Sequence, residues 1–327
     1  MLAAEILAPA ISGSCALLAF YDSHKNILHV ANTGDSRAVL GHMSKPGKWT
    51  ATPLSEDQTG RNPQEAQRVR MEHPGEEPIR NGRVLGGLEP TRAFGDASYK
   101  WNREFAERLS PKFFGRAPRP LLKTPPYVTA APEITTTTIS PEQGDFVVLA
   151  TDGLWELLSN DEVVGLVGKW LEKYGPSTTK NTPHMEKIWL NFVGPRGELP
   201  LDKDLPAGER ADTENQKSPE DELRRRGLSP DKQRFVVEDN NVATHLVRNA
   251  LGGKKQEQVS ALLTLPYPTS RRFRDDLTVQ VIFFGNRGPV TGEVNVNQQA
   301  TAASKVPTKP KVQTATPGLS QGLKAKL

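Results

Sequence analysis

A single cysteine, Cys15, occurs among the 327 residues of the chain. One thiol cannot form a disulfide within the chain or supply a cysteine-rich zinc site. In the stretch SGSCALLAF, Cys15 has the apolar neighbours of a small core residue rather than the surroundings of a nucleophile. We therefore expect neither a disulfide framework nor catalysis by a thiol.

Apolar residues make up only 36% of the chain, which predicts that part of its length lies outside a packed core. No apolar run reaches the roughly 18 residues that are needed to cross a bilayer, so no transmembrane segment is expected. The first residues, MLAAEILAPAISGS, lack the charged start and long apolar core of a signal peptide, and they contain no arginine for a transit peptide. No targeting segment can therefore be identified in this sequence.

The formal net charge of +4 is concentrated at the C-terminal end of the sequence. Residues 287–327 contain six basic residues and one acidic residue, a net charge of +5, which leaves about −1 for residues 1–286. A nucleic-acid role therefore has no basic folded face, although binding through the basic tail stays open as an alternative. Thr, Gln, Lys and Pro dominate residues 287–327, which predicts a disordered tail.

Several common catalytic signatures are also missing. Ser36 in TGDSRAV lies outside a G-x-S-x-G motif, which favours a turn residue over a serine nucleophile. The six histidines show no H-E-x-x-H spacing, and we interpret His245 as a packing or surface residue rather than a ligand. GRVLGG lacks the lysine of a phosphate-binding loop, and we interpret the arginines of RRRG and SRRFRDD as solvated or paired.

Short apolar runs bounded by Asp, Asn or Gly predict antiparallel strands at residues 14–22, 26–34 and 36–41. A last strand is predicted at 277–285, where apolar residues occupy both alternating positions and both faces are expected to be largely covered.

Helical patterns occur between these strands. A polar helix is predicted at 62–75, and a buried strand at 144–150 precedes a helix at 159–174 that starts with a capping box. A short helix is expected at 240–253, with glycine at its end. Residues 175–233 are rich in proline and mixed charge, which predicts a disordered or loosely packed insertion.

Three aspartates lie at or beside strand ends: Asp96 in TRAFGD, Asp152 in LATDGLWE and Asp275 in RFRDDLTV. Mg²⁺ and Mn²⁺ prefer carboxylate oxygens and waters as ligands, and two such ions can clamp a phosphate and activate a water. The pattern alone leaves two interpretations open. The aspartates form one shared metal site, or they are unrelated turn residues, as an Asp-Gly pair such as Asp152-Gly153 often is.

Four motifs occur in a characteristic order: VANTGDSRAVLG, NGRVLGGLEPTRAFGD, VVLATDGLWELLSNDEVV and RDDLTVQVIFF. In this order they resemble the metal-dependent protein serine/threonine phosphatases of type 2C, the PPM family. Within that family, TPPYVTAAPEIT, DGLWE and NNVATHLVRNALGG are most similar to the mitochondrial pyruvate dehydrogenase phosphatase branch. The resemblance covers roughly residues 11–285, with 175–233 less clearly matched.

The resemblance implies an α+β fold over residues 1–286, a PPM-type sandwich of two antiparallel β-sheets flanked by α-helices. It implies hydrolysis of phosphoserine and phosphothreonine by a water that Mg²⁺ or Mn²⁺ activates, on pyruvate dehydrogenase or a related phosphoprotein in the mitochondrion. Asp152 and Asp275 resemble ligands of one of two catalytic metals. Asp96 resembles a ligand of a third, weaker metal to which Asp152 also contributes, and Glu156 stands where many members have another aspartate ligand.

The sequence departs from the family pattern at its start. The family's first strand carries an arginine that binds the phosphate and an acidic pair. The next segment, D-G-H-G-G, carries an aspartate that bridges the two metals and a histidine that can act as an acid. No residues in this sequence match either segment. We therefore expect an N-terminally incomplete domain that lacks the first strands, no catalytic residue beyond the metal ligands, and weak or no activity for the chain as given. The alternative is a pseudophosphatase, which binds a phosphoprotein without hydrolysing it.

Overall fold

The structure is a computed structural model, and it describes residues 2–45, 47–109, 117–174, 199–202, 219–228 and 234–285. The predicted tail at 287–327 lies outside these ranges, as does most of the segment 175–233. The described residues belong to one compact unit. In these ranges no helix combines the length and the apolar character needed to cross a membrane.

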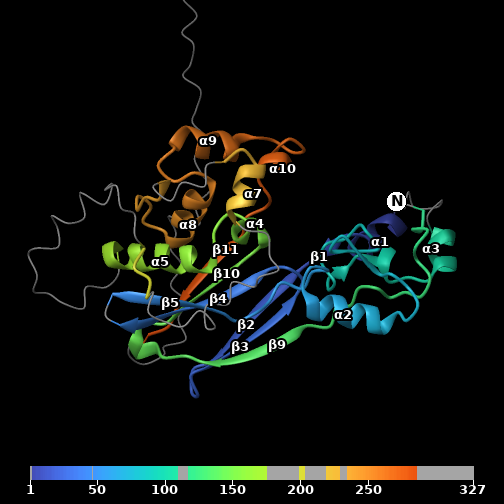
Figure 1. Cartoon of the computed structure of the whole chain (residues 1–327), viewed down its shortest axis with the longest axis horizontal. Coiled ribbons are helices and arrows are strands. Elements are labelled where there is room, and N and C mark those ends of the chain that lie inside the picture. Colours follow the sequence, from blue (N-terminus) through green and yellow to red (C-terminus); the bar gives the residue numbers. More distant parts are fainter. Residues whose placement is uncertain are drawn as a thin grey trace, which may run out of the picture. The chain divides into compact units, whose positions relative to one another are not determined.

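Two antiparallel sheets form the centre of this unit (Figure 1). Every pair of neighbouring strands in them runs antiparallel, which confirms the predicted α+β class with antiparallel sheets and the strands expected at 14–22, 26–34 and 36–41. One sheet has the order β2 (Ala16–Asp22), β3 (Ile27–Thr33) and β9 (Glu133–Thr138). The other has the order β11 (Val279–Phe283), β10 (Phe146–Ala150), β4 (Arg37–Lys45) and β5 (Lys48–Pro53).

Strand β10 shows how the two sheets share the interior. All five of its residues are buried, and successive side chains point to opposite faces. Val147 and Leu149 lie in one core with Leu28 of β3, which fills the space between the sheets. The other three residues of β10 lie in a second core with residues of the helices. Both faces of β10 are therefore dry, and its C-terminal end is held at a fixed position.

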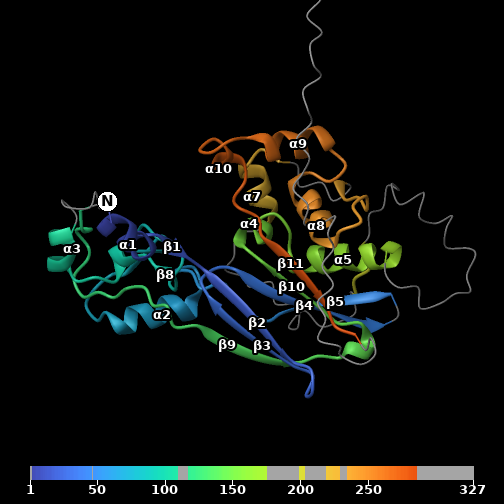
Figure 2. The same ribbon diagram turned by 180° about the vertical axis from the view of Figure 1, so that it is seen from behind.

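Helices pack on the outer face of the four-stranded sheet (Figure 2). They are α5 (Asn160–Tyr174), α7 (Pro219–Arg225), α8 (Val242–Leu251) and α9 (Gln256–Thr264). Helices α5 and α8 lie next to the strands of this sheet, and α7 and α9 lie farther out in the same apolar core. The predicted capping box starts α5: the Ser159 N–H donates to Glu162 Oε2 at 3.1 Å, and the Glu162 N–H donates to Ser159 Oγ at 3.2 Å. His245 on α8 is fully buried, with Nε2 3.1 Å from Leu166 O, which confirms its interpretation as a packing residue.

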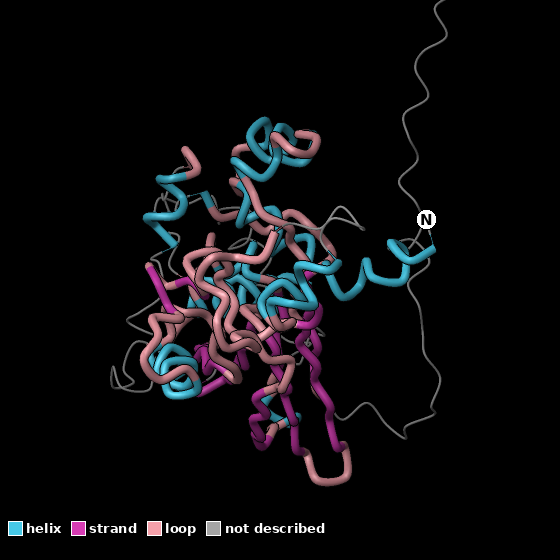
Figure 3. Tube along the Cα trace, turned by 90° about the vertical axis from the view of Figure 1, so that its right-hand side faces the viewer, coloured by secondary structure: helices cyan, strands magenta, loops and turns pink. Residues whose placement is uncertain are grey.

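Further short elements complete the unit, and some of them surround a third, smaller core. In Figure 3 the helices and strands are distinguished by colour along the trace. The predicted polar helix is α2 (Pro63–Glu72), whose first turn is capped by Asn62. The other elements are α1 (Leu2–Ile11), α3 (Arg103–Leu109), α4 (Asp152–Trp155), α10 (Ser270–Phe273), and the short strands β1 (Gly13–Ser14), β6 (Ile79–Arg80), β7 (Arg83–Val84) and β8 (Phe94–Gly95).

The last strand differs from its prediction in one respect. Both faces of the strand at 277–285 were expected to be largely covered, but Ile282 and Phe283 are each 39% exposed. The reason is topological: β11 lies at the edge of its sheet, with β10 as its neighbour in the ladder.

Parts of the segment 175–233 pack on the domain. Trp49 N–H donates to Pro200 O at 2.8 Å, and Asp202 N–H donates to Trp49 O at 2.9 Å, so residues 199–202 run along β5. Leu223 on α7 is 2% exposed in the helical core. The rest of the expected insertion lies outside the described residues.

Candidate metal centre

Asp152 is the first residue of α4, directly after the end of β10. The intervening Thr151 is extended and forms the N-cap of α4. The Asp152-Gly153 pair therefore starts a helical turn instead of forming a β-turn. As a result, the rigid end of a buried strand fixes the position of the Asp152 carboxylate.

Hydrogen bonds of Thr151 hold this turn against the segment before β11. Its N–H donates to Thr278 O at 3.1 Å, its Oγ1 donates to Asp276 O at 2.9 Å, and the Thr278 N–H donates to the same Oγ1 at 3.0 Å. Gly153 permits this close approach, because a Cβ there would lie 2.4 Å from Asp276 O. These contacts bring Asp275 beside Asp152.

The pKa of Asp152 shows how crowded the negative charge is here. Burial, followed by the charges of Asp35, Asp275 and Glu156, raises this pKa from 3.8 to about 8. Cations among the described residues reach the edge of the group: Arg271 Nη2 lies 3.5 Å from Asp275 Oδ1, and Arg226 is paired with Glu156. A bound divalent cation stabilises a partly buried carboxylate that has several acidic neighbours.

Asp35, between β3 and β4, is a member of this group that the sequence analysis missed. The Cys15 Sγ–H donates to Asp35 Oδ1 at 3.1 Å, and burial raises the pKa of Asp35. Burial, followed by the charge of Asp35, raises the pKa of Cys15 to about 12, so its thiol stays protonated and is a poor nucleophile. The sequence signal for Asp35 in TGDSRAV is its position just after a predicted strand, which it shares with Asp152.

Asp96 lies at a neighbouring position, against β1. It adopts a left-handed backbone conformation with φ of 48°, and its N–H donates to Ser12 O at 2.9 Å. Gly13 leaves room for its carboxylate, because a Cβ there would lie 2.3 Å from Asp96 Oδ2. Burial raises the pKa of Asp96, and nearby Lys100 lowers it. Gly13 thus lies beside Asp96, and Cys15 is hydrogen-bonded to Asp35. Gly13 and Cys15 are two residues apart, a separation of about 7 Å in an extended chain.

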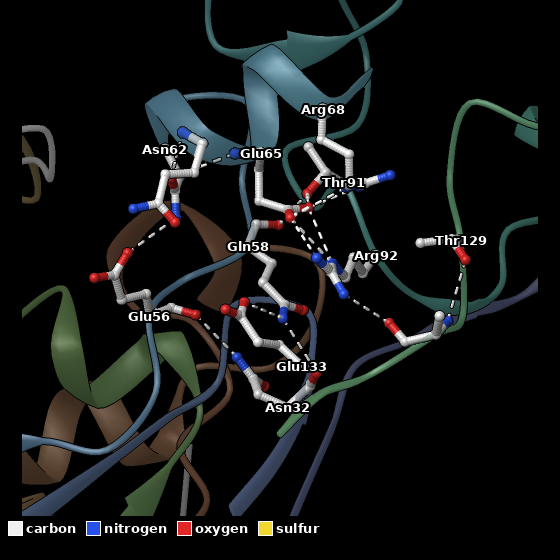
Figure 4. Close-up of polar contacts among 12 residues, drawn as sticks. Asn32, Glu56, Gln58, Asn62, Glu65, Arg68, Thr91, Arg92, Thr129 and Glu133 are labelled. Carbon is white, nitrogen blue, oxygen red and sulfur yellow. Dashed lines mark hydrogen bonds and ion pairs between the residues drawn. The ribbon is translucent and has the colours of Figure 1, made fainter. Parts of the chain in front are cut away.

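A buried ion-pair network holds the segment that leads to Asp96 (Figure 4). Glu65 of α2 accepts hydrogen bonds from Thr91 Oγ1 at 2.5 Å and from Arg92 Nη2 at 2.6 Å, and Arg68 Nη2 donates to it at 2.7 Å. Burial works to raise the pKa of Glu65, but these donors hold it at about 2. Glu65 therefore remains ionised and anchors the start of the segment 91–96 to α2.

Glu156 lies one helical turn after Asp152, at the C-cap of α4, and its N–H donates to Asp152 O at 2.8 Å. Its carboxylate accepts a short hydrogen bond from Arg226, the residue that follows α7. Glu156 thus contributes negative charge near Asp152 while being paired with a cation.

The structure places Asp152, Asp275 and Glu156 near one another, whereas Asp96 lies against β1, where Lys100 is the charged group that acts on its pKa. The donors are carboxylates, and this chemistry fits a hard divalent cation such as Mg²⁺ or Mn²⁺. Within the described ranges, no three His, Cys, Asp or Glu side chains stand close enough together to hold an ion as they are. Carboxylates repel one another, so their side chains need to move inward to share one cation.

Comparisons with known proteins give the family of the chain. The family model described as protein phosphatase 2C matches residues 2–185. A protein phosphatase 2C homologue of Schizosaccharomyces pombe is 47% identical over 288 residues, which cover 87% of this chain and 56% of the relative. The mitochondrial pyruvate dehydrogenase [acetyl-transferring]-phosphatase 1 of Saccharomyces cerevisiae is 46% identical over 296 residues, which cover 86% of this chain and 48% of the relative.

The human protein of that name is 35% identical over 297 residues, which cover 86% of this chain and 49% of the relative. The chain therefore spans about half the length of the curated relatives that it matches.

Proposed function

The chain belongs to the protein phosphatase 2C family, and from this premise we propose that it is the metal-dependent part of a protein serine/threonine phosphatase. The observation that carries the proposal is the position of Asp152. A buried strand end presents it beside Asp275, among carboxylates that raise its pKa to about 8. Among the described residues no cation forms an ion pair with Asp152 itself, whereas Glu65 on α2 is paired with two arginines.

In this proposal Asp152 and Asp275 bind one Mg²⁺ or Mn²⁺, and Asp96 binds a further, weaker ion with Asp152. When bound, such ions activate a water and neutralise charge on a phosphoryl group. The chain's own residues set the geometry. Thr151 fixes the distance between the two aspartate-bearing segments, and the Asp96 segment is held by Ser12.

The substrate proposed is a phosphoserine or phosphothreonine protein in the mitochondrion, with phosphorylated pyruvate dehydrogenase as the first choice. This choice is supported by the names of the relatives from Saccharomyces cerevisiae and human, which share 46% and 35% of the aligned residues. The chain spans about half of each relative, and no residues in it match the family's D-G-H-G-G segment, so the proposal includes weak or no catalysis by these residues alone.

The test measures release of inorganic phosphate from phosphorylated pyruvate dehydrogenase and from an unrelated phosphoserine protein, with and without Mn²⁺. We expect at most weak Mn²⁺-dependent release, which is lost in Asp152→Asn and Asp275→Asn. Asp221→Asn is the matched control, because Asp221 is an exposed aspartate on α7. Release that persists in Asp152→Asn would refute the assignment. Tight binding of the phosphoprotein without hydrolysis would favour the alternative of a phosphoprotein-binding protein.

A further inference from the structure

Arg226 is a buried cation that reaches the α4 turn from a distant part of the chain. Its side chain is 4% exposed, and it directly follows α7, which lies within the polar segment 175–233. Its Nε donates to Glu222 Oε1 at 2.6 Å, and its Nη2 donates to Glu156 Oε2. The guanidinium therefore joins two carboxylates, one on α7 and one at the end of α4.

The α7 end of this link is firmly held. Glu222 is 1% exposed and also accepts a hydrogen bond from Arg225 Nε at 2.7 Å. Burial works to raise the pKa of Glu222, but hydrogen bonds from Arg225 and Arg226 hold it at about 2. Leu223 lies in the same apolar core as Leu154 of α4. Apolar packing and an ion pair thus tie α7 to the turn that carries Asp152.

The pairing also bears on what Glu156 can do. A guanidinium that donates to a carboxylate occupies lone pairs that a metal would need and places positive charge close to the metal position. Glu156 is 22% exposed, so solvent does not fully screen this charge. Binding of a divalent cation by Glu156 would therefore require the loss of a buried ion pair.

We propose that Glu156 and Arg226 form a brace that fixes α7 to the Asp152 turn, and that Glu156 is a positioning residue instead of a metal ligand. The brace gives the polar segment around α7 a role at the metal centre. The part of the inference that concerns metal binding rests on the proposed function, whereas the coupling between Glu156 and Arg226 does not.

The costs of removing one or both members of the brace distinguish it from an ion pair on the surface. Removing Glu156 leaves the buried guanidinium with one carboxylate partner, and removing Arg226 leaves both Glu156 and Glu222 short of a donor, so each single change is costly. In the double variant Glu222 alone loses a donor, and it keeps the hydrogen bond from Arg225. Arg226 Nη1 has no hydrogen-bond partner among the described residues, so the pair is not ideally satisfied and its joint removal is expected to be mild. Non-additivity between the two positions is therefore the signature to measure.

The first experiment compares Glu156→Gln, Arg226→Met and the double variant by urea unfolding. We expect Arg226→Met to raise the unfolding equilibrium constant on the order of 100-fold, and the double variant to be more stable than Arg226→Met alone. Arg224→Met is the matched control, because Arg224 is 63% exposed on the same helix and should change that constant less than about fivefold. Additive effects of the two single changes would overturn the brace.

The second experiment titrates the same proteins with Mn²⁺ by calorimetry, with Asp152→Asn as the variant expected to lose binding. The double variant should bind Mn²⁺ with the stoichiometry of the unaltered chain and within about threefold of its affinity, because the ligand set of Asp152 and Asp275 is intact. Loss of a bound Mn²⁺ in both Glu156→Gln and the double variant would overturn the positioning role. If the unaltered chain binds no Mn²⁺, the proposed function fails, and the unfolding experiment still decides whether the brace exists.

Discussion

Replacing Asp152 by asparagine should stabilise the metal-free protein, although most substitutions at ordered positions destabilise. The folded carboxyl keeps its proton up to about pH 8, whereas the unfolded carboxyl ionises above pH 3.8. Folding at neutral pH therefore requires Asp152 to bind a proton. Asparagine is neutral in both states, so the variant avoids this requirement.

The magnitude follows from the two pKa values. At pH 7 the cost of protonating Asp152 on folding is about 4 kcal/mol, since each pKa unit corresponds to about 1.4 kcal/mol. The side chain is only partly buried, and solvent screening reduces this figure, so we expect a gain of about 2 kcal/mol. For a domain of this size the melting temperature should rise by roughly 5 °C. The cost is absent below the unfolded pKa and grows as pH rises toward the folded pKa, so the gain should vanish near pH 4.

The assay is thermal unfolding of the two proteins at pH 4 and pH 7, first with a chelator and then with excess Mn²⁺. Ligand at about 100 times its Kd stabilises a folded protein by about 2.7 kcal/mol, and only the unaltered chain should show such an increase. A lower melting temperature for Asp152→Asn at pH 7 with chelator would refute the electrostatic argument. An equal gain at pH 4 and pH 7 would also refute it, since the effect would then have another cause.

Three further changes test the surroundings of the site by urea unfolding. Glu65→Gln, which leaves two partly buried arginines short of a carboxylate, should cost about 3 kcal/mol. Glu72→Gln, on the exposed side of the same helix, should cost less than about 1 kcal/mol, and equal costs would contradict the network. Gly153→Ala should lower the free energy of unfolding by about 1–3 kcal/mol, because its Cβ would clash with Asp276 O. Gly285→Ala, in open space, should lower it by less than about 0.5 kcal/mol. No change in Gly153→Ala would contradict the close approach of Gly153 to Asp276. Burial lowers the pKa of His245 from 6.5 to about 4. The contribution of neutral His245 to the free energy of unfolding is therefore present above pH 6.5 and is lost as pH falls toward 4. About 2 kcal/mol should disappear between pH 7.5 and pH 5, and His245→Gln should lose this part of the pH dependence; an unchanged slope would show that other groups cause it.

Elements with a strong local signal were predicted well from sequence. The capping box at Ser159 is formed by residues three apart, so its hydrogen bonds depend on local sequence alone. The exposure of Ile282 and Phe283 was not predictable in this way. An apolar residue on a strand is covered only if another element packs on its face, and the position of β11 at a sheet edge is a property of the topology.

The candidate site shows the same division. Asp152, Asp275 and Asp96 could be singled out because each lies at or beside a strand end, and a family motif surrounds each of them. The pairing of Glu156 with Arg226 could not be predicted, because 70 residues separate them and RRRG contains three adjacent arginines. These arginines are expected from sequence to be solvated or paired, and the structure shows that Arg226 is the one that is buried.

Contacts from remote segments hold each part of the site, so the sequence motifs alone do not determine the geometry of the site. The Asp152 turn depends on a hydrogen bond with Thr278, 127 residues from Thr151, and Asp96 depends on Ser12. The stability of such an arrangement is set by its weakest contact, because local opening there releases the residue that it holds. A relative can therefore keep the letters of LATDGLWE and still lose the geometry of Asp152 if it lacks a partner such as Arg226. Retention of these distant partners is thus a stricter criterion for a working site than retention of the motif.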